Sequence, residues 1–317
     1  MRRALFAGFV LLFACASPQT KRGAVFFEYD QCTIDIDDGP CIHHYESIAA
    51  GGAQQRILLR NANGCGQPNV SSVRSTDESV FTAALTASGD VLVTTGAAGA
   101  ADLELLDGGG GLIDAATLRV EDVASIPPLK DPSGPVILAG NVQTLHLDRL
   151  DARGIVLIGT GGTVFSSTGP IARDADPPTS GDRFAGTPFT FHGDVGDAVL
   201  TATHGAASFT APMHFVDTTG IAAVQIFAEQ HPVVEKGTSL ITVDSIGVDA
   251  AGKSIFGTRC NWSSFSGTAA LYDDAELEKD ELPPSFLELG GVRRDYFSGH
   301  GTATCTIAAA TATVTIP

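Results

Sequence analysis

The stretch Thr144-Leu-His-Leu-Asp-Arg-Leu-Asp-Ala-Arg-Gly154 returns later in the chain as Ile241-Thr-Val-Asp-Ser-Ile-Gly-Val-Asp-Ala-Ala-Gly252. In both copies an alternating apolar run leads to Asp-Ala-x-Gly. An aromatic-Ser-Ser triplet follows, Phe165-Ser-Ser167 in one copy and Trp262-Ser-Ser264 in the other. Period-two alternation predicts a strand, while an Asp that bonds the turn backbone and a Gly at positive φ predict a hairpin. The repeat therefore predicts strand, hairpin and a second strand with a core aromatic, twice.

The same alternation extends through most of the chain. Examples are Arg56–Arg60, Val91–Thr95, Phe189–His192 and Ala312–Ile316. Gly, Asp, Asn and Pro interrupt these runs about every ten residues, as in a sandwich or barrel. The sequence predicts an all-β protein with almost no helix.

The first third of the chain carries a second pattern. It reads Ser75-Thr-Asp-Glu-Ser-Val80, then Gly89-Asp-Val91, then Gly96-Ala-Ala-Gly99. This pattern is similar to that of group 2 bacterial immunoglobulin-like domains, over most of residues 70–125 and more loosely over 120–317. The resemblance implies tandem Ig-like β-sandwiches on an exported protein. The chain departs from the family between Cys32 and Cys65 and in an acidic insertion after Leu271.

We predict three sandwich domains after a signal peptide and a tether. Pro127-Pro128 marks a boundary near Val123, and Thr218-Thr-Gly220 marks another. Short junctions of this kind predict a semi-rigid rod. The expected limits are 1–14 for the signal peptide, 15–22 for the tether, and 23–122, 123–217 and 218–317 for the sandwiches.

The N-terminus reads as an export signal. Arg2 and Arg3 precede an apolar run that ends at Ala14, and this run is too short for a permanent membrane span. Leu12-Phe13-Ala14-Cys15 resembles the bacterial lipobox, which implies cleavage before Cys15 and lipids on its thiol and new amino group. The alternative is an ordinary secretory signal, cut after Ala14 or Ala16.

The lipobox also predicts a destination. No Asp follows Cys15, and in Gram-negative lipoproteins such an Asp is linked to inner-membrane retention. The resemblance therefore implies an exported, outer-membrane-anchored lipoprotein that faces the periplasm or the cell surface. Its expected membrane contact is the lipid anchor at Cys15.

Composition limits the partners. The chain has 317 residues, 44% hydrophobic and 17% charged, with a formal net charge of -17. Loss of Arg2 and Arg3 with the signal makes it -19, from 17 basic and 36 acidic residues (19 minus 2 basic). Such a charge argues against nucleic acid and against electrostatic docking on anionic lipid.

The chain has six cysteines, and export places them in an oxidising compartment. We pair Cys260 with Cys305, because they stand alone in the C-terminal third. Near the N-terminus we pair Cys41 with Cys65, which leaves Cys32 over or paired elsewhere. Sequence does not fix the connectivity.

The sequence does not predict a catalytic motif. Ser298-Gly-His-Gly-Thr302 and Gly237-Thr-Ser239 resemble the histidine and serine motifs of subtilisin-like proteases. In that family the serine follows the histidine, whereas here it precedes it, and no helical setting is predicted. We interpret the histidine segment as a hairpin turn that leads into the strand with Cys305, and we predict a protein that is not an enzyme.

Metal and cofactor sites are not predicted either. Asp35, Asp37 and Glu46 have the spacing of a calcium loop, but Pro40 stands where Gly is required. Another calcium site that uses Asp30, Asp35, Asp37 or Asp38 stays open. His43-His44 would point to opposite faces of a strand. The acidic segment 273–281 is interpreted as a solvated loop, with a cation or basic partner as the alternative.

The function hypothesis is a non-catalytic, membrane-anchored envelope lipoprotein that acts as a spacer or as an adhesion or ligand-binding module for a protein or glycan. The alternative is an exported carbohydrate-binding protein, or a hydrolase accessory protein, on a β scaffold. Flat sugar sites need aromatic platforms, and Trp262 is the single tryptophan. Since it matches Phe165 in the repeat, we expect it in the core.

Overall fold

The structure is a computed structural model. It describes residues 20–29, 47–62, 67–129, 131–175, 187–228, 233–235, 238–272 and 293–317. These residues form two compact units. The first contains the described residues up to Ala124 together with Arg149–Gly162, and the second contains Ser125–Asp148, residues 163–175 and the described part of Thr187–Pro317.

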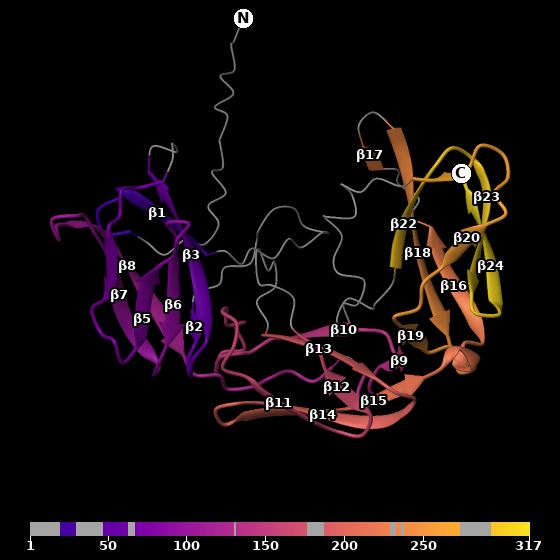
Figure 1. The fold of residues 1–317 in the computed structure, drawn as a ribbon, viewed down its shortest axis with the longest axis horizontal. Coiled ribbons are helices and arrows are strands. Elements are labelled where there is room, and N and C mark those ends of the chain that lie inside the picture. The colour runs from indigo at the N-terminus through magenta and orange to yellow at the C-terminus, as the bar shows by residue number, and fades with distance from the viewer. Residues whose placement is uncertain are drawn as a thin grey trace, which may run out of the picture. The chain divides into compact units, whose positions relative to one another are not determined.

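The protein is all-β, as the sequence predicts, and its sheets form layered sandwiches (Figure 1). One 3-10 turn, Thr218–Gly220, is the single helical element among the described residues. No helix in the described part of the chain is long and apolar enough to cross a membrane.

The first sandwich has immunoglobulin topology. One sheet has the order β1-β3-β6-β5 and the other β2-β8-β7-β4, which match the A-B-E-D and G-F-C sheets of an Ig domain with β2 added beside the last strand. Side chains that alternate inward from both sheets share one core, which includes Phe27, Phe81 and Leu103. The strands are β1 (Val25–Tyr29), β2 (Ile48–Ala49), β3 (Gln54–Asn61), β4 (Ser72–Ser75), β5 (Phe81–Leu85), β6 (Val91–Thr95), β7 (Gly99–Leu106) and β8 (Leu112–Glu121).

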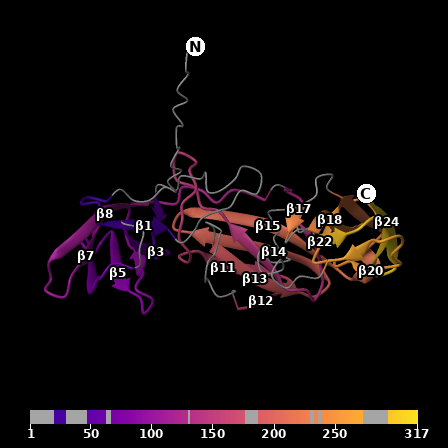
Figure 2. The ribbon, with the colours of Figure 1, turned by 90° about the horizontal axis from the view of Figure 1, so that it is seen from above.

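The second sandwich repeats this order within the second unit. Its B-E-D sheet is β10-β13-β12, and its C-F-G strands are β11-β14-β15, which Figure 2 shows side by side. Phe191 and Phe215 meet edge to face between the layers. The strands are β9 (Val136–Leu138), β10 (Gln143–Leu147), β11 (Val164–Thr168), β12 (Ile171–Arg173), β13 (Thr187–Gly193), β14 (Gly196–His204) and β15 (Ala207–Val216).

The third sandwich packs β16-β18-β22-β21 against β20-β23-β24. Val243, Phe297 and Ile316 are buried between these layers. The strands are β16 (Ala223–Ala228), β17 (Val233–Glu235), β18 (Thr238–Val248), β19 (Ser254–Phe256), β20 (Asn261–Ser263), β21 (Ala270–Leu271), β22 (Arg293–Ser298), β23 (Gly301–Ile307) and β24 (Ala310–Ile316).

The compact units follow a different division from the sandwiches. The boundary expected near Val123 lies beside the end of the first unit at Ala124, and the one expected near Thr218 lies inside the second unit. Arg149–Gly162, which contains the Asp151–Gly154 turn of the first repeat copy, belongs to the first unit, whereas the strand before it, up to Asp148, belongs to the second. The division at 122/123 and 217/218 stays a prediction.

The segment around His300 differs from its prediction. It was expected to be a hairpin, but β22 pairs with β18 and β21, whereas β23 pairs with β20 and β24. The turn therefore crosses from one sheet to the other. Gly299 has φ 78°, and a Cβ there would lie 2.0 Å from the carbonyl oxygen of Thr268. A Cβ on Gly301 would lie equally close to the carbonyl oxygen of Ser266, so both glycines let the crossing turn pack against the backbone of residues 266–268.

Candidate functional site: the hairpin junctions

The repeated Asp-Ala-x-Gly segments form the hairpins that the sequence predicts. Asp249 Oδ1 accepts hydrogen bonds from the backbone N–H groups of Ala251 (2.9 Å) and Lys253 (2.8 Å). Asp151 Oδ1 bonds Arg153 N (2.8 Å) and Ile155 N (2.9 Å) in the same way. The glycine of each turn, at 252 and at 154, has φ 81°. In this conformation a residue with a Cβ is strained.

Two further hairpins use the same geometry in the first sandwich. Asp107 closes the turn between β7 and β8, with Oδ1 bonded to the N–H groups of Gly109 and Gly111 at 2.8 Å each. In the β5–β6 turn, Thr86 Oγ1 takes that role and accepts from Asp90 N at 3.1 Å. This turn shape therefore occurs at several places in the molecule. The two repeat hairpins differ from the other turns in the strands beside which they lie, as described below.

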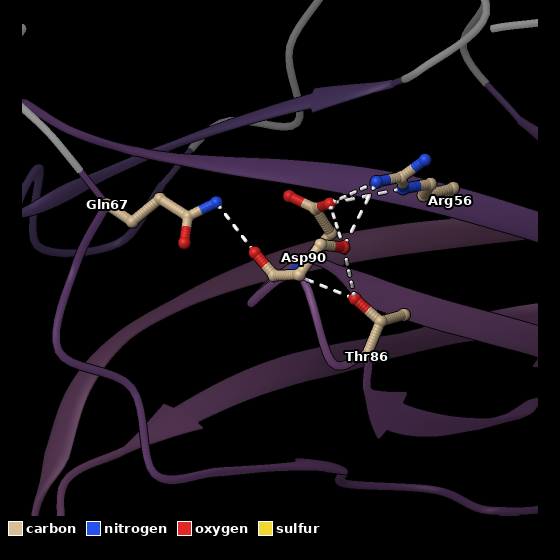
Figure 3. Close-up of polar contacts among 5 residues, drawn as sticks. Arg56, Gln67, Thr86 and Asp90 are labelled. Atoms are coloured by element: carbon tan, nitrogen blue, oxygen red, sulfur yellow. Dashed lines mark hydrogen bonds and ion pairs between the residues drawn. The ribbon is translucent and has the colours of Figure 1, made fainter. Parts of the chain in front are cut away.

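The β5–β6 turn is fixed by a polar cluster that Figure 3 shows. The carboxylate of Asp90, which is 4% exposed, accepts hydrogen bonds from Arg56 Nε (3.2 Å) and from Ser88 Oγ (2.8 Å). Gln67 Nε2 donates to the Ser88 carbonyl at 2.8 Å. The contacts of Arg56 and Gln67 join the turn to β3 and to the segment before β4, and the Ser88 contact closes the turn itself, so the cluster is structural.

The Asp249 hairpin places β19 beside a strand of the second sandwich. Ile255 pairs in parallel with Val136, and Phe256 pairs with Ile137. β9 in turn runs parallel to β15, where Val136 faces His214. One sheet thus continues through β15, β9, β19 and β18. We call Asp249–Thr258, β9 and the loop Asp131–Gly134 the hairpin junction.

Lys253, the last residue of the hairpin, holds that loop. Its ammonium group donates to Ser133 Oγ (2.6 Å) and to the Gly134 carbonyl (2.5 Å), and lies 2.9 Å from Asp131 Oδ2. The hydrogen bond from Lys253, helped by Ser133, holds the pKa of the Asp131 carboxyl well below its ordinary value. The loop approaches Pro212 so closely that a Cβ on Gly134 would lie 1.9 Å from the Pro212 oxygen. Only glycine fits there.

His214 also contacts the loop of the junction. Its position between Asp197 and Ser133 resembles the Asp-His-Ser arrangement of a catalytic triad. Its Nδ1 lies 2.7 Å from Asp197 Oδ1, and its Nε2 lies 2.9 Å from an oxygen of Ser133. That oxygen is the backbone carbonyl. The Ser133 hydroxyl donates instead to Asp131 Oδ1 at 2.7 Å. The imidazole therefore braces the loop and does not activate a nucleophile.

A second hairpin junction occurs in the first unit. Ile158 forms a parallel bridge with Ile48 in β2, and Ala49 N donates to the Ile158 carbonyl at 3.0 Å. β2 runs parallel to β8, as β9 does to β15. The motifs Ile158-Gly-Thr160 and Phe256-Gly-Thr258 thus take the same place, each beside a short strand parallel to the last strand of a sandwich.

The buried guanidinium of Arg149 supports the junction in the first unit. Arg149 is 0% exposed, and its Nη1 donates to the Gly161 carbonyl at 3.0 Å. Nη2 donates to the Gly159 carbonyl. The buried charge therefore orders the segment that follows the hairpin.

The aromatic residues of the repeat were expected in the core, and both are partly buried and pack against core aromatic residues. Trp262 meets Phe297 edge to face at 4.8 Å, and its Nε1 donates to Asp295 Oδ2 at 2.7 Å. Phe165 stacks on Phe189 at 4.5 Å. Neither ring forms part of a flat exposed platform of the kind that sugars stack on.

The predicted disulfide between Cys260 and Cys305 is present, with Cα atoms 5.4 Å apart. Cys15, Cys41 and Cys65 lie outside the described residues, as does Cys32. The same holds for Asp30, the other acidic candidates at 35, 37, 38 and 46, and the segment 273–281. Among the residues that the structure describes, no group of three or more His, Cys, Asp and Glu side chains could hold a metal ion.

Sequence reasoning did not find Lys253, His214 or Asp131. A lysine that follows Asp-Ala-Ala-Gly is a weak signal, because its partners lie more than 100 residues earlier in the chain. The one usable indication was that Asp131-Pro-Ser-Gly134 has turn-forming composition near an expected boundary.

No protein-family model matches this chain, and no curated protein matches it. Among solved structures, the S-layer protein SbsC (residues 31–844) is 15% identical, over 95% of this chain and 40% of that one, with a TM-score of 0.32. Invasin, titled a bacterial integrin-binding protein, is 14% identical over 86% of this chain and 58% of its own, with a TM-score of 0.25. Titin domains A168–A170 are 11% identical over 94% and 95%, with a TM-score of 0.21.

The chain spans less than half of the S-layer chain. All three TM-scores are below 0.5, so the Ig assignment rests on the strand order and not on these similarities.

Proposed function

We propose that this chain is a non-catalytic envelope lipoprotein, anchored through lipids on Cys15, in which Ig-type sandwiches form a stiff spacer that carries an adhesion or ligand-binding surface. The observation that supports this proposal is the sheet that continues from β15 through β9 and β19 to β18. Consecutive sandwiches of the second unit are thus joined by backbone pairing.

A spacer has to hold its outer part at a fixed distance from its anchor. A flexible linker cannot do so, because its end-to-end distance fluctuates. At the hairpin junction the Lys253 contacts with Asp131, Ser133 and Gly134 add to the parallel pairing of β9 and β19. Both sets of contacts oppose bending at this point.

The anchor is tested by fractionation. Cys15→Ser should release the full-length protein from the membrane fraction, because the thiol that accepts lipid is lost. Ser17→Ala, a change in the expected tether that keeps the thiol of Cys15, is the matched control and should stay with the membrane. Retention of the Cys15→Ser protein would remove the lipid anchor from the proposal.

The stiffness is tested by amide hydrogen exchange on the full-length protein. Backbone amides of β9 and β19 should be protected, and Lys253→Met should accelerate their exchange. Lys21→Met, which removes a lysine ion-paired with Asp102 in the first unit, is the matched control and should leave them unchanged. If the β9 and β19 amides of the unaltered protein exchange as fast as those of exposed turns, the spacer proposal fails.

A further inference from the structure

A short segment from later in the chain completes the core of the first sandwich. Ile158 follows β8, the last strand of that sandwich, and is fully buried in the core cluster that includes Ile48 of β2. Arg149–Gly162 belongs to the first unit, whereas the strands before and after it, β10 and β11, belong to the second. We call Val156–Thr160 the docked segment, because it occupies the first sandwich while the chain on both sides of it continues elsewhere.

Backbone pairing holds the docked segment at two places. Ala49 N donates to the Ile158 carbonyl at 3.0 Å, and Ile158 N donates to the Ser47 carbonyl at 3.2 Å. Farther along, Gln54 N donates to the Thr160 carbonyl at 2.6 Å, and Thr160 N donates to the Gln54 carbonyl at 2.7 Å. Strand addition of this kind binds peptides in many proteins: main-chain hydrogen bonds provide affinity, and a pocket for a side chain provides specificity. Here the side chain in the core is that of Ile158.

The position after Ile158 is restricted to glycine. Gly159 has φ 99°, and a Cβ there would lie 3.2 Å from the Gln54 carbonyl oxygen and 3.2 Å from Ile48 Cγ2. A larger residue would therefore be strained and crowded. The site thus selects a sequence in which a buried, branched apolar residue is followed directly by glycine.

β2 does not depend on the docked segment for its place in the sheet. On its other side it pairs in parallel with β8, and Ala50 N donates to the Glu121 carbonyl at 2.9 Å. Contacts with few backbone hydrogen bonds open at a lower free energy than the sheets of a core. Release of the docked segment would therefore leave the two sheets of the first sandwich in place.

We propose that β2 and Ala53–Gln54 form a strand-binding site on the first sandwich, whose ligand is an extended peptide with a branched apolar residue followed by glycine. The docked segment is the ligand within this chain, and it leaves and re-enters the site while the sandwich stays folded. The same sequence, supplied as a free peptide, binds the site when the docked segment has left it. All of these contacts lie in the first unit, so the site is independent of the spacer proposal, which depends on β9 and β19.

Opening of the site is tested by amide exchange on the unaltered full-length protein, purified in detergent. Ala49 and Ala50 are neighbours whose N–H groups bond to opposite sides of β2, the first to Ile158 and the second to Glu121. After correction for intrinsic rates, the Ala49 and Gln54 amides should exchange about tenfold or more faster than the Ala50 amide. Equal rates for all three would mean one cooperative opening and would refute the proposal.

Peptide binding is tested with Ile158→Asp in the full-length protein, because a carboxylate is too costly to keep in the apolar core. Ala152→Asp adds the same charge at the exposed tip of the hairpin and is the matched control. The probe is a fluorescently labelled peptide with the sequence of residues 155–161, followed by two lysines for solubility. By fluorescence anisotropy it should bind Ile158→Asp about tenfold or more tightly than the control. It should also restore the protection of the Ala49 amide.

A second peptide, with glycine in place of the isoleucine at 158, should bind neither variant. The proposal is wrong if the first peptide binds the two variants equally, if the two peptides bind equally, or if neither peptide binds Ile158→Asp. If Ile158→Asp does not fold, Thr160→Pro replaces it, because it removes the N–H group that donates to Gln54 and leaves the core side chain in place. If neither variant folds, the exchange rates of the unaltered protein decide.

Discussion

The first and third sandwiches share a strand order but are braced by different chemistry. In the first, the buried carboxylate of Asp114 binds four backbone N–H groups, those of Arg22 and Ala115 through Oδ1 and those of Ala24 and Val25 through Oδ2. In the third, the disulfide between Cys260 and Cys305 joins the segment before β20 to β23. The same topology is thus fastened by an ionised group in one place and by a covalent bond in the other.

The two braces differ in what can undo them. Burial raises the pKa of Asp114, but the hydrogen bonds from four N–H groups outweigh it and keep the pKa below its ordinary value. That brace is sensitive to acid. A disulfide does not titrate in this range and is sensitive to reductant. The comparison therefore predicts separate responses, and each can be measured.

The largest expected effect is that of Cys260→Ser. Loss of the disulfide should lower the stability of the third sandwich by about 2–4 kcal/mol, since the bridge constrains the unfolded chain. Trp262, the single tryptophan, lies in this sandwich and reports its unfolding by fluorescence in urea. Amide protection of β8 should not change. A Trp262 transition that neither Cys260→Ser nor a reductant shifts would show that the bridge does not brace this sandwich.

Asp114→Asn should have the next largest effect, confined to the first sandwich. An amide has one acceptor oxygen, so two of the four N–H groups would face an NH2 group, at a cost of about 1–3 kcal/mol. Faster exchange of the β1 and β8 amides is the expected readout. An unchanged Trp262 transition serves as the internal control, and unaltered exchange in β1 would contradict the role given to Asp114.

The first and third sandwiches should also differ in their stability in acid. The folded pKa of Asp114 is below the unfolded value of about 3.9, so its contribution is complete above that value and is lost as pH falls through the folded pKa. The first sandwich should therefore lose stability below about pH 4. In Asp114→Asn this loss should shrink. An acid profile identical in the two proteins would assign the effect to other carboxylates, such as Asp102, whose pKa the hydrogen bond from Lys21 lowers.

The smallest effect should come from Arg74→Ala. Its ion pair with Glu104 is exposed on the arginine side, and such pairs contribute at most about 1 kcal/mol. Thermal unfolding should barely change at physiological salt. Glu104→Gln is the matched variant that removes the other partner. A loss of unfolding free energy well above about 1 kcal/mol in either variant would show that this ion pair itself stabilises the first sandwich.

Much of the fold could be predicted from local patterns. The Asp-Ala-x-Gly hairpins follow from turn chemistry within five residues, and the strand alternation follows from burial of one face. The Cys260–Cys305 pair followed from elimination within the C-terminal third. The repeat also predicted that Trp262 and Phe165 are alike, and both are partly buried rings that pack against a core phenylalanine.

The hairpin junctions could not be predicted from sequence. β2 and β9 are two and three residues long, too short for a periodic signal, and their parallel partners are distant in the chain. From the sequence, Asp114 is one of many polar residues in predicted strands. Its role as an acceptor depends on the backbone N–H groups of the N-terminal segment, which is about 90 residues earlier in the chain. The crossing at His300 was missed because a hairpin and a corner use the same glycines.

The parallel pairing of β9 with β15 has a mechanical consequence. The chain enters the second sandwich at β9 and leaves it at the end of β15. Tension applied to the two ends pulls these neighbours in opposite directions along their length. Their hydrogen bonds are then loaded together in shear, whereas an antiparallel hairpin pulled open from its ends unzips one bond at a time. A protein stretched between two surfaces would therefore resist at this three-residue contact.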